Sequence, residues 1–318
     1  MNSINISAIL PVVVLSVFGI AVMVAEPFVR DRSKSQLGWL AFAGTLAAML
    51  ALIPMVRNRG QWYANSWVVD DYSVVFSFVF LLIAAVTILT SLDFLLRESM
   101  NHAEFYALLL FATAGMLMMS GSNELMMVFL GLEILSIATY VMAGFRRTDL
   151  RSNESALKYF LLGSFSSAFF LYGIALIFGA TGSTNLLAIA DALRSAQVQA
   201  SLVYLSAAMM LIALCFKVAV APFHIWTPDV YEGAPTPVTG FMSVGPKAAG
   251  FAVLVRVFLT AFPTITERWS SAIWLIAALT MVVGNVIALV QPNIKRMLAY
   301  SSIAHAGYVA VAVASTSG

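Results

Sequence analysis

The chain has 318 residues, of which 61% are hydrophobic and only 10% are charged. Since soluble domains carry about 25% charged residues, this composition excludes an ordinary water-soluble fold. The formal net charge of +2 indicates no acidic partner and no nucleic acid, and a single cysteine, Cys215, excludes an iron–sulfur cluster or a structural zinc site held by cysteines of this chain.

Repeated apolar runs of about 20 residues, separated by short polar loops, predict transmembrane helices along the whole chain. Transmembrane β-strands would be shorter and would alternate polar with apolar residues, a pattern that this sequence does not show. The predicted fold class is therefore all-α, a single polytopic membrane domain over residues 1–318. Its spans are expected over residues 5–25, 37–56, 72–96, 104–120, 124–144, 155–180, 200–222, 237–262, 271–291 and 298–316.

The basic residues of the loops are unevenly distributed, and this predicts an orientation. The loops after odd-numbered spans contain Arg30, Arg32, Lys34, Arg97, Arg146, Arg147, Arg151, Lys295 and Arg296. The loops after even-numbered spans contain only Arg57, Arg59, Arg194 and Arg268. Because positive loops stay in the cytoplasm, the N-terminus of this multi-pass chain is predicted on the outer side of the membrane.

Three charged residues lie deep inside predicted spans, namely Glu133 in the fifth, Lys217 in the seventh and Lys247 in the eighth. Each charge at the centre of a membrane costs about 2.5–3.5 kcal/mol on insertion scales, so such residues are candidates for function. The alternative to a functional role is a static ion pair that holds the helices together. Two lysines and one glutamate would, however, leave one positive charge uncompensated. We therefore expect these three residues to have a functional rather than a purely structural role.

Other ionisable residues in or near the spans leave more than one interpretation open. Lys158 follows Glu154 by four residues, so an i,i+4 ion pair or a lysine reaching the interface competes with a functional role. Arg256 fits the same interfacial interpretation. A haem held by His224 and His305 is conceivable, but nothing else indicates a haem pocket, and no redox centre is expected on this chain.

The segment LIALCFKVAVAPFHIWTPDVYEGAPTPVTGFMS places Lys217 in an apolar helix and then interrupts that helix with prolines, beginning at Pro222. Proline removes a backbone hydrogen bond, and the freed carbonyls are tolerated at membrane depth only inside protein or beside water. Pro246 directly precedes Lys247, so a second break is expected there. His224 lies seven residues after Lys217, and the segment predicts a hydrated polar path across the membrane.

Three stretches resemble one family. KVAVAPFHIWTPDVYEGAPTPVT, ALKYFLLGSFSSAFFLYGIALIFGATGS and QPNIKRMLAYSSIAHAGY are similar to motifs of the antiporter-like subunits of respiratory complex I and of Mrp-type antiporters. The resemblance covers essentially the whole chain and implies an inverted-repeat fold. It implies that Glu133 is the family's helix-five glutamate, Lys217 its broken-helix lysine, Lys247 its helix-eight lysine and His224 a relay residue; Lys158 is added as a further candidate.

The resemblance also implies partners and a longer chain. Family members have about fourteen helices and a further lysine on a broken twelfth, so this chain is expected to be truncated. It would work with other membrane-arm and redox subunits of complex I in the lipid bilayer. Those subunits would use NADH, FMN, iron–sulfur clusters and quinone, while this chain binds no cofactor and has no GxxxxGK[ST] nucleotide loop.

The predicted activity is proton translocation driven by redox chemistry in partner subunits. A carboxylate and an ammonium about 4 Å apart interact by roughly 4 kcal/mol at an effective dielectric of 20, more than the ~2.3 kcal/mol needed to move one charge against 100 mV. Making and breaking a Glu133–Lys217 pair would thus be large enough to drive proton exchange with Lys247. A sodium–proton antiporter subunit, a solute transporter with a midplane site and a membrane scaffold remain alternatives.

Overall fold

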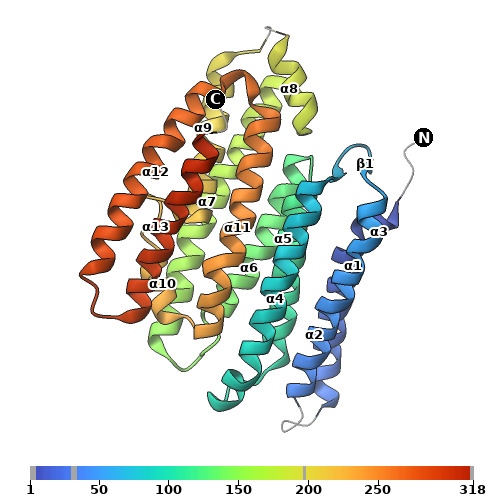
Figure 1. The fold of residues 1–318 in the computed structure, drawn as a ribbon, viewed down its shortest axis with the longest axis vertical. Helices are drawn as coiled ribbons and strands as arrows, with labels where there is room; N and C mark the ends of the chain where they lie inside the picture. Colours follow the sequence, from blue (N-terminus) through green and yellow to red (C-terminus); the bar gives the residue numbers. More distant parts are fainter. Residues whose placement is uncertain (1–4, 30–33, 196–197, 316–318) are drawn as a thin grey trace. The chain divides into compact units, whose positions relative to one another are not determined.

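The computed structural model describes residues 5–29, 34–195 and 198–315 (Figure 1). Arg30 and Arg32, which enter the predicted orientation, lie outside the described residues. The chain divides into two compact units, which are taken separately below. One unit comprises Met1–Ala156 and Ala234–Ala249, and the other comprises Leu157–Gly233 and Gly250–Gly318.

The first unit is a helical bundle with a small β-hairpin. A capping box begins its longest complete helix, because the Asp70 carboxylate accepts from the Ser73 backbone N–H and the Ser73 hydroxyl accepts from the Asp70 N–H. The elements, in chain order, are α1 (Ile6–Ala25), η1 (Glu26–Phe28), α2 (Ser35–Leu50), α3 (Leu52–Arg57), β1 (Gly60–Trp62), β2 (Trp67–Val69), α4 (Asp71–Arg97), α5 (Ala103–Gly121), α6 (Leu125–Ala143) and the start of α7 (Leu150–Thr181). The two strands are antiparallel.

Close packing of α5 on α6 forms the centre of this unit. A Cβ placed on Gly131 would lie 2.8 Å from the carbonyl oxygen of Gly115, and one placed on Gly115 would lie 2.6 Å from that of Gly131. Both contacts are shorter than real Cβ atoms allow. Only glycine therefore lets the two backbones approach this closely, as small residues do between membrane helices.

The second unit contains the rest of α7 and the C-terminal helices. Its α12 and α13 pack closely, since a Cβ on Gly284 would lie 2.7 Å from the backbone nitrogen of Ala304. The short helix α10 packs on α13. The elements are α8 (Leu186–Arg194), α9 (Ala200–Val218), α10 (Thr227–Gly233), α11 (Thr236–Ala261, which begins in the first unit), η3 (Pro263–Ile265), α12 (Thr266–Leu289) and α13 (Ile294–Ala314).

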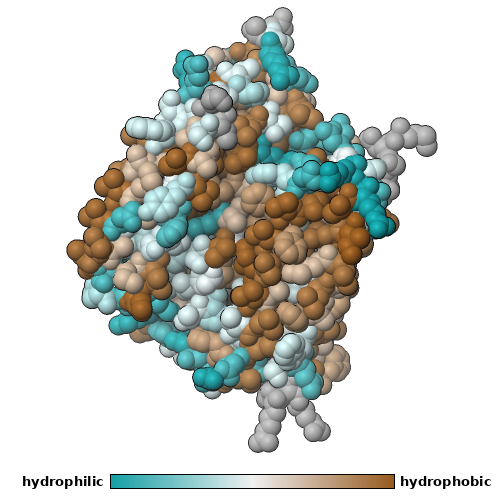
Figure 2. All heavy atoms as spheres, viewed as in Figure 1, coloured by the Kyte–Doolittle hydropathy of each residue, from teal (hydrophilic) through white to brown (hydrophobic). Residues whose placement is uncertain are grey.

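Ten helices in the described part of the chain are long and apolar enough to cross a membrane, which confirms the predicted all-α membrane fold. Hydrophobic side chains spread over the helix flanks, whereas hydrophilic ones gather mostly toward helix ends (Figure 2). Such an apolar exterior suits lipid rather than water.

Several details differ from the predicted spans. The span predicted over residues 200–222 ends at Val218, and the span over residues 37–56 is divided into α2 and α3. The hairpin, α8 and α10 were not predicted. The break expected at Pro246 was wrong, because α11 continues without interruption through Pro246 and Lys247. Membrane helices tolerate an internal proline where neighbouring groups satisfy the freed backbone.

Candidate functional site

The break after α9 is the first component of the candidate site. Ala219, directly after the last helical residue, adopts a left-handed conformation with φ 59° and turns the chain out of the helix. The Val220 N–H still donates to the Cys215 carbonyl at 3.1 Å. The Trp226 indole donates to the Phe216 carbonyl at 3.2 Å, and the Ala221 N–H donates to the Thr280 hydroxyl at 2.9 Å. Protein groups therefore satisfy these backbone atoms of the break.

Lys217 lies in the last turn of α9 and is only 4% exposed. Its Nζ is 6.0 Å from the centroid of the Tyr159 ring on α7, at the outer limit of a cation–π contact. Tyr159 stacks in turn on Trp226, with ring centroids 4.5 Å apart and planes 8° from parallel. A Cβ on Gly250 would lie 3.5 Å from the Lys217 Cγ, so α11 passes close to this lysine. The predicted broken helix with a buried lysine is therefore present.

Lys247 occupies a buried position in α11 and is 5% exposed. It belongs to the first unit, where its neighbour Gly245 faces α5; a Cβ there would lie 3.2 Å from the Met116 sulfur. The lysine thus sits in a tightly packed part of the helix rather than at a break.

Glu133 lies in the middle of α6, two residues after the close approach at Gly131. One of its carboxylate oxygens, Oε1, is buried and has no hydrogen-bond partner among the described residues. A buried polar atom in this state indicates either strain or a functional role. Glu133 and Lys217 belong to different units, so the predicted pairing between them stays a prediction.

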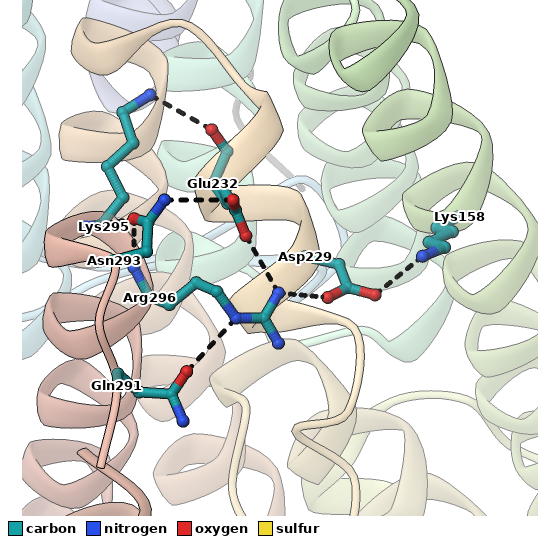
Figure 3. Close-up of polar contacts among 7 residues, drawn as sticks. All are labelled: Lys158, Asp229, Glu232, Gln291, Asn293, Lys295 and Arg296. Atoms are coloured by element: carbon teal, nitrogen blue, oxygen red, sulfur yellow. Dashed lines mark hydrogen bonds and ion pairs between the residues drawn. The ribbon is translucent and has the colours of Figure 1, made fainter. Parts of the chain in front are cut away.

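A charged network at the helix ends forms a second component, in the second unit (Figure 3). Asp229 on α10 accepts from the Lys158 ammonium of α7 at 2.8 Å and from the Arg296 guanidinium of α13 at 2.6 Å. Arg296 also pairs with Glu232, one turn after Asp229 on α10, at 3.0 Å. Two cations and two carboxylates therefore join three helices.

Polar groups around Glu232 extend this network (Figure 3). The Asn293 amide donates to the Glu232 carboxylate at 3.1 Å, and the Lys295 ammonium donates to the Glu232 backbone carbonyl at 3.3 Å. The Asn293 side-chain oxygen also caps α13 by accepting from the backbone N–H groups of Lys295 and Arg296. These hydrogen bonds hold the start of α13 against α10.

The electrostatics of Asp229 follow from these contacts. Partial burial raises the pKa of its carboxyl, but the hydrogen bonds and positive charges of Lys158 and Arg296 outweigh burial. The pKa of Asp229 is therefore lowered from its ordinary value, and the residue is a stable anion.

The network adds to two interpretations. Arg296 was interpreted as a topology marker, which stays a prediction, and the structure shows in addition that it pairs with both α10 carboxylates. Lys158 was weighed as a partner of Glu154 or an interfacial lysine, and the structure brings it to Asp229, 71 residues further along the chain. The i,i+3 spacing of Asp229 and Glu232 was the sequence signal that could have indicated this network, because it places both carboxylates on one helix face, where one cation can reach both.

His224 lies in the turn between α9 and α10, where its ring packs edge-on against Tyr300 at 6.4 Å between centroids. Because the helix breaks between Lys217 and His224, the two-turn spacing of an unbroken helix does not apply to them. The other candidate haem ligand, His305, is exposed, and its Nδ1 contacts the Ser301 carbonyl at 2.8 Å.

One group of residues within the described ranges could hold a metal ion, namely Glu26, His102 and Glu104, with ligand atoms within 4.8 Å of one another. Both carboxylates already face cations: Lys34 lies 3.4 Å from Glu26, and Arg147 lies 3.6 Å from Glu104. These ion pairs compensate the negative charge that would attract a metal.

The apolar helices define a polytopic membrane protein, and buried lysines on such helices, one of them beside a helix break, are candidates for an ion pathway. Residues 122–318 match the family described as NADH:quinone oxidoreductase/Mrp antiporter, transmembrane, and the chain belongs to this family.

More particularly, the chain is similar to NADH-quinone oxidoreductase subunit N of Trichlorobacter lovleyi, at 48% identity over 315 residues. This match covers 99% of the chain and 65% of the relative. A chain in the structure of respiratory complex I from Thermus thermophilus with bound aureothin matches with a TM-score of 0.79 and 39% identity, over 95% of this chain and 64% of that one.

The Mrp complex from Dietzia sp. shares the fold, with a TM-score of 0.76 at 22% identity, over 98% of this chain and 59% of that chain. The chain thus spans less than two thirds of the length of each of these three relatives.

Proposed function

We propose that the chain is a proton-translocating membrane-arm subunit of NADH–quinone oxidoreductase. Its similarity to a protein named subunit N, over nearly the whole chain, supports this assignment. The single structural observation that supports proton transfer best is Lys217, buried at the point where α9 ends. A buried ammonium beside a helix break can release and regain a proton at a cost that small rearrangements change.

The proposed proton carriers are Lys217 and Lys247, both nearly fully buried. Glu133 supplies a negative charge that changes the proton affinity of Lys217, and His224 extends the relay toward the cytoplasm. Lys158 is the fifth proposed participant, and it would have to loosen its ion pair with Asp229 before transferring a proton. Redox reactions in other subunits supply the energy.

The proposal includes the surroundings of the chain. Its partners are other membrane-arm subunits and the redox subunits that use NADH, FMN, iron–sulfur clusters and quinone. The chain lies in a bacterial inner membrane with a periplasmic N-terminus, as the basic residues of its loops indicate.

Substitution of Lys217 tests the proposal. In assembled complex reconstituted into vesicles, Lys217→Met removes the proton site but fills similar space, and Lys217→Arg keeps a charge that guanidinium does not lose. Both variants should impair NADH-driven proton uptake while the subunit content stays unchanged. Full proton uptake by Lys217→Arg would show that Lys217 only holds helices together.

The same vesicles separate protons from sodium. Proton uptake should be unchanged when choline replaces sodium, and no NADH-driven transport of radioactive sodium should be seen. Sodium transport that depends on Lys217 would instead support the antiporter alternative, which the shared fold of the Mrp complex does not exclude.

Cysteine labelling tests the orientation. A cysteine placed at Arg151, in the Arg146–Arg151 segment, should resist impermeant thiol reagents in intact cells and react after the membrane is opened. Labelling in intact cells would reverse the proposed orientation.

A further inference from the structure

The second unit contains a small cavity between α9, from its second turn to its middle, and the first two turns of α12. Its volume is about 240 Å³, and it is lined by Tyr204, Ala207, Ala208, Leu211, Ile265, Arg268, Trp269 and Ala272. Three lining side chains carry hydrogen-bonding groups, namely Arg268, Tyr204 and Trp269. The Trp269 indole is already engaged, because it donates to the Phe262 carbonyl at 3.2 Å. The other lining side chains are hydrocarbon. The cavity therefore favours a hydrocarbon chain.

The cation at this cavity is Arg268, in the first turn of α12. Its guanidinium lies 4.3 Å from the centroid of the Tyr204 ring, which fixes the side chain over the first turns of α9. Within the described ranges, no carboxylate lies within ion-pairing distance of Arg268. Since no described carboxylate pairs with it, its five N–H donors can bind an anion from outside.

The position of the cavity along the helices limits what that anion can be. Ala200 and Thr266 begin α9 and α12, so Tyr204 and Arg268 both lie where a membrane-crossing helix enters the bilayer. Tyrosine and tryptophan at this depth are typical of the membrane–water interface. Phosphodiester groups of lipids occupy the same depth, and their acyl chains extend along the helix toward Ala208 and Leu211.

We propose that this cavity binds an anionic phospholipid, with its phosphate on the Arg268 guanidinium and part of one acyl chain between α9 and α12. Guanidinium matches phosphate with two parallel hydrogen bonds, and the charges are complementary. The volume lies below the ~300 Å³ at which pockets for whole drug-sized molecules begin, which suits a segment of an acyl chain rather than a complete ligand.

Photocrosslinking in native membranes tests this inference. Cells would express the full chain in its complex, the membranes would receive phosphatidylglycerol with a diazirine in its acyl chain, and labelled peptides would be quantified by mass spectrometry. Peptides containing Ala207–Leu211 or Ala272 should be labelled above other membrane-facing peptides of the chain. Arg268→Gln should lower this labelling about tenfold, as expected for losing a charge-assisted contact, and Arg268→Lys should retain part of it.

Arg194→Gln is the matched control, because Arg194 is another exposed arginine in an even loop and pairs with Asp191 at 3.2 Å. It should leave the labelling unchanged. Ala208→Leu, which fills the cavity without changing charge, should lower labelling as well. The amount of chain in the membrane is measured for every variant, so loss of folding is not mistaken for loss of binding.

Three outcomes would overturn the inference. Equal labelling in wild type and Arg268→Gln would show that the guanidinium does not hold the lipid. Equal labelling by a neutral diacylglycerol probe would show simple partition into an apolar cavity. Competition by inorganic phosphate alone would identify a site for a free anion.

Discussion

Two carboxylates of this protein, Glu133 and Asp229, have opposite surroundings. Asp229 lies at a helix end, where Lys158 and Arg296 both bind it. Glu133 lies in the middle of a membrane-spanning helix, and its buried Oε1 has no hydrogen-bond partner among the described residues. The same functional group is therefore held by fixed partners in one region and left able to change partners in the other.

This difference separates charged residues that stabilise the structure from charged residues that are candidates for proton transport. A carboxylate held by two cations loses the charge that strengthens both contacts when it is protonated, so it favours one fixed, ionised arrangement. A mid-helix carboxylate with an unsatisfied oxygen is costly to bury, and membrane proteins retain such residues for ion and proton pathways. We therefore expect substitutions at Glu133 to affect transport and substitutions at Asp229 to affect stability.

The largest expected effect is on proton pumping. Glu133→Gln preserves shape and removes the charge, so it should lower NADH-driven pumping about tenfold, as the loss of ~1.4 kcal/mol of stabilisation in the rate-limiting step would do. Asp229→Asn should lower pumping much less and should lower the melting temperature of the complex. Both quantities are measured on assembled complex. Unchanged pumping by Glu133→Gln would reduce that residue to a structural one.

The next effect concerns how Glu133 is positioned. A Cβ at Gly131 would lie 2.8 Å from the Gly115 carbonyl, so Gly131→Ala must push α5 and α6 apart. It should destabilise the protein by about 1–3 kcal/mol, as overpacking does. Gly240→Ala in α11 is the matched control, because among the described residues no atom outside its own stretch of helix lies within 4 Å of the added Cβ. Thermal unfolding that is equal for both variants would contradict the packing argument.

A smaller effect is expected from the polar network. Asp229→Asn and Arg296→Gln each remove a partner, and the double variant should lose less stability than the sum of the two. The coupling should be about 1 kcal/mol, because both side chains are partly exposed to solvent. A coupling near zero would show that Arg296 stabilises the helix end mainly through Glu232.

Much of the fold could be predicted from the sequence, because apolar runs of membrane length are local signals. All ten predicted spans correspond to helices, and the break after Lys217 was expected from the prolines that follow it. Pro246 did not break α11, because the effect of a proline depends on whether its surroundings satisfy the freed backbone.

The charged network was not predicted, because its partners are far apart in the sequence. Lys158 and Arg296 lie 71 and 67 residues from Asp229 in the sequence. Only residues three or four apart are neighbours on one helix, so these spacings do not predict the contacts. By contrast, Glu133, Lys217 and Lys247 were found from depth alone, since any charge in an apolar run is conspicuous. Depth does not reveal partners, so the relay among these residues stays a prediction.

The smallest expected effect is the dependence of stability on pH at Asp229. Burial raises the pKa of this carboxyl, but Lys158 and Arg296 lower it further, so the folded value lies below the unfolded value of about 3.9. The folded state therefore binds the proton less readily than the unfolded state. The stability that the ionised carboxylate contributes is complete above the unfolded pKa and is lost as the pH falls through the folded one.

The measurement is the difference in melting temperature between wild type and Asp229→Asn. Other carboxylates titrate in the same range, and taking the difference removes their contribution. The gap should be constant between about pH 6 and 7 and should shrink below about pH 4, by less than ~1 kcal/mol in stability because the side chain is partly exposed. A gap that widens on acidification would mean that the folded pKa of Asp229 is raised, and the two cations would then not be its controlling partners.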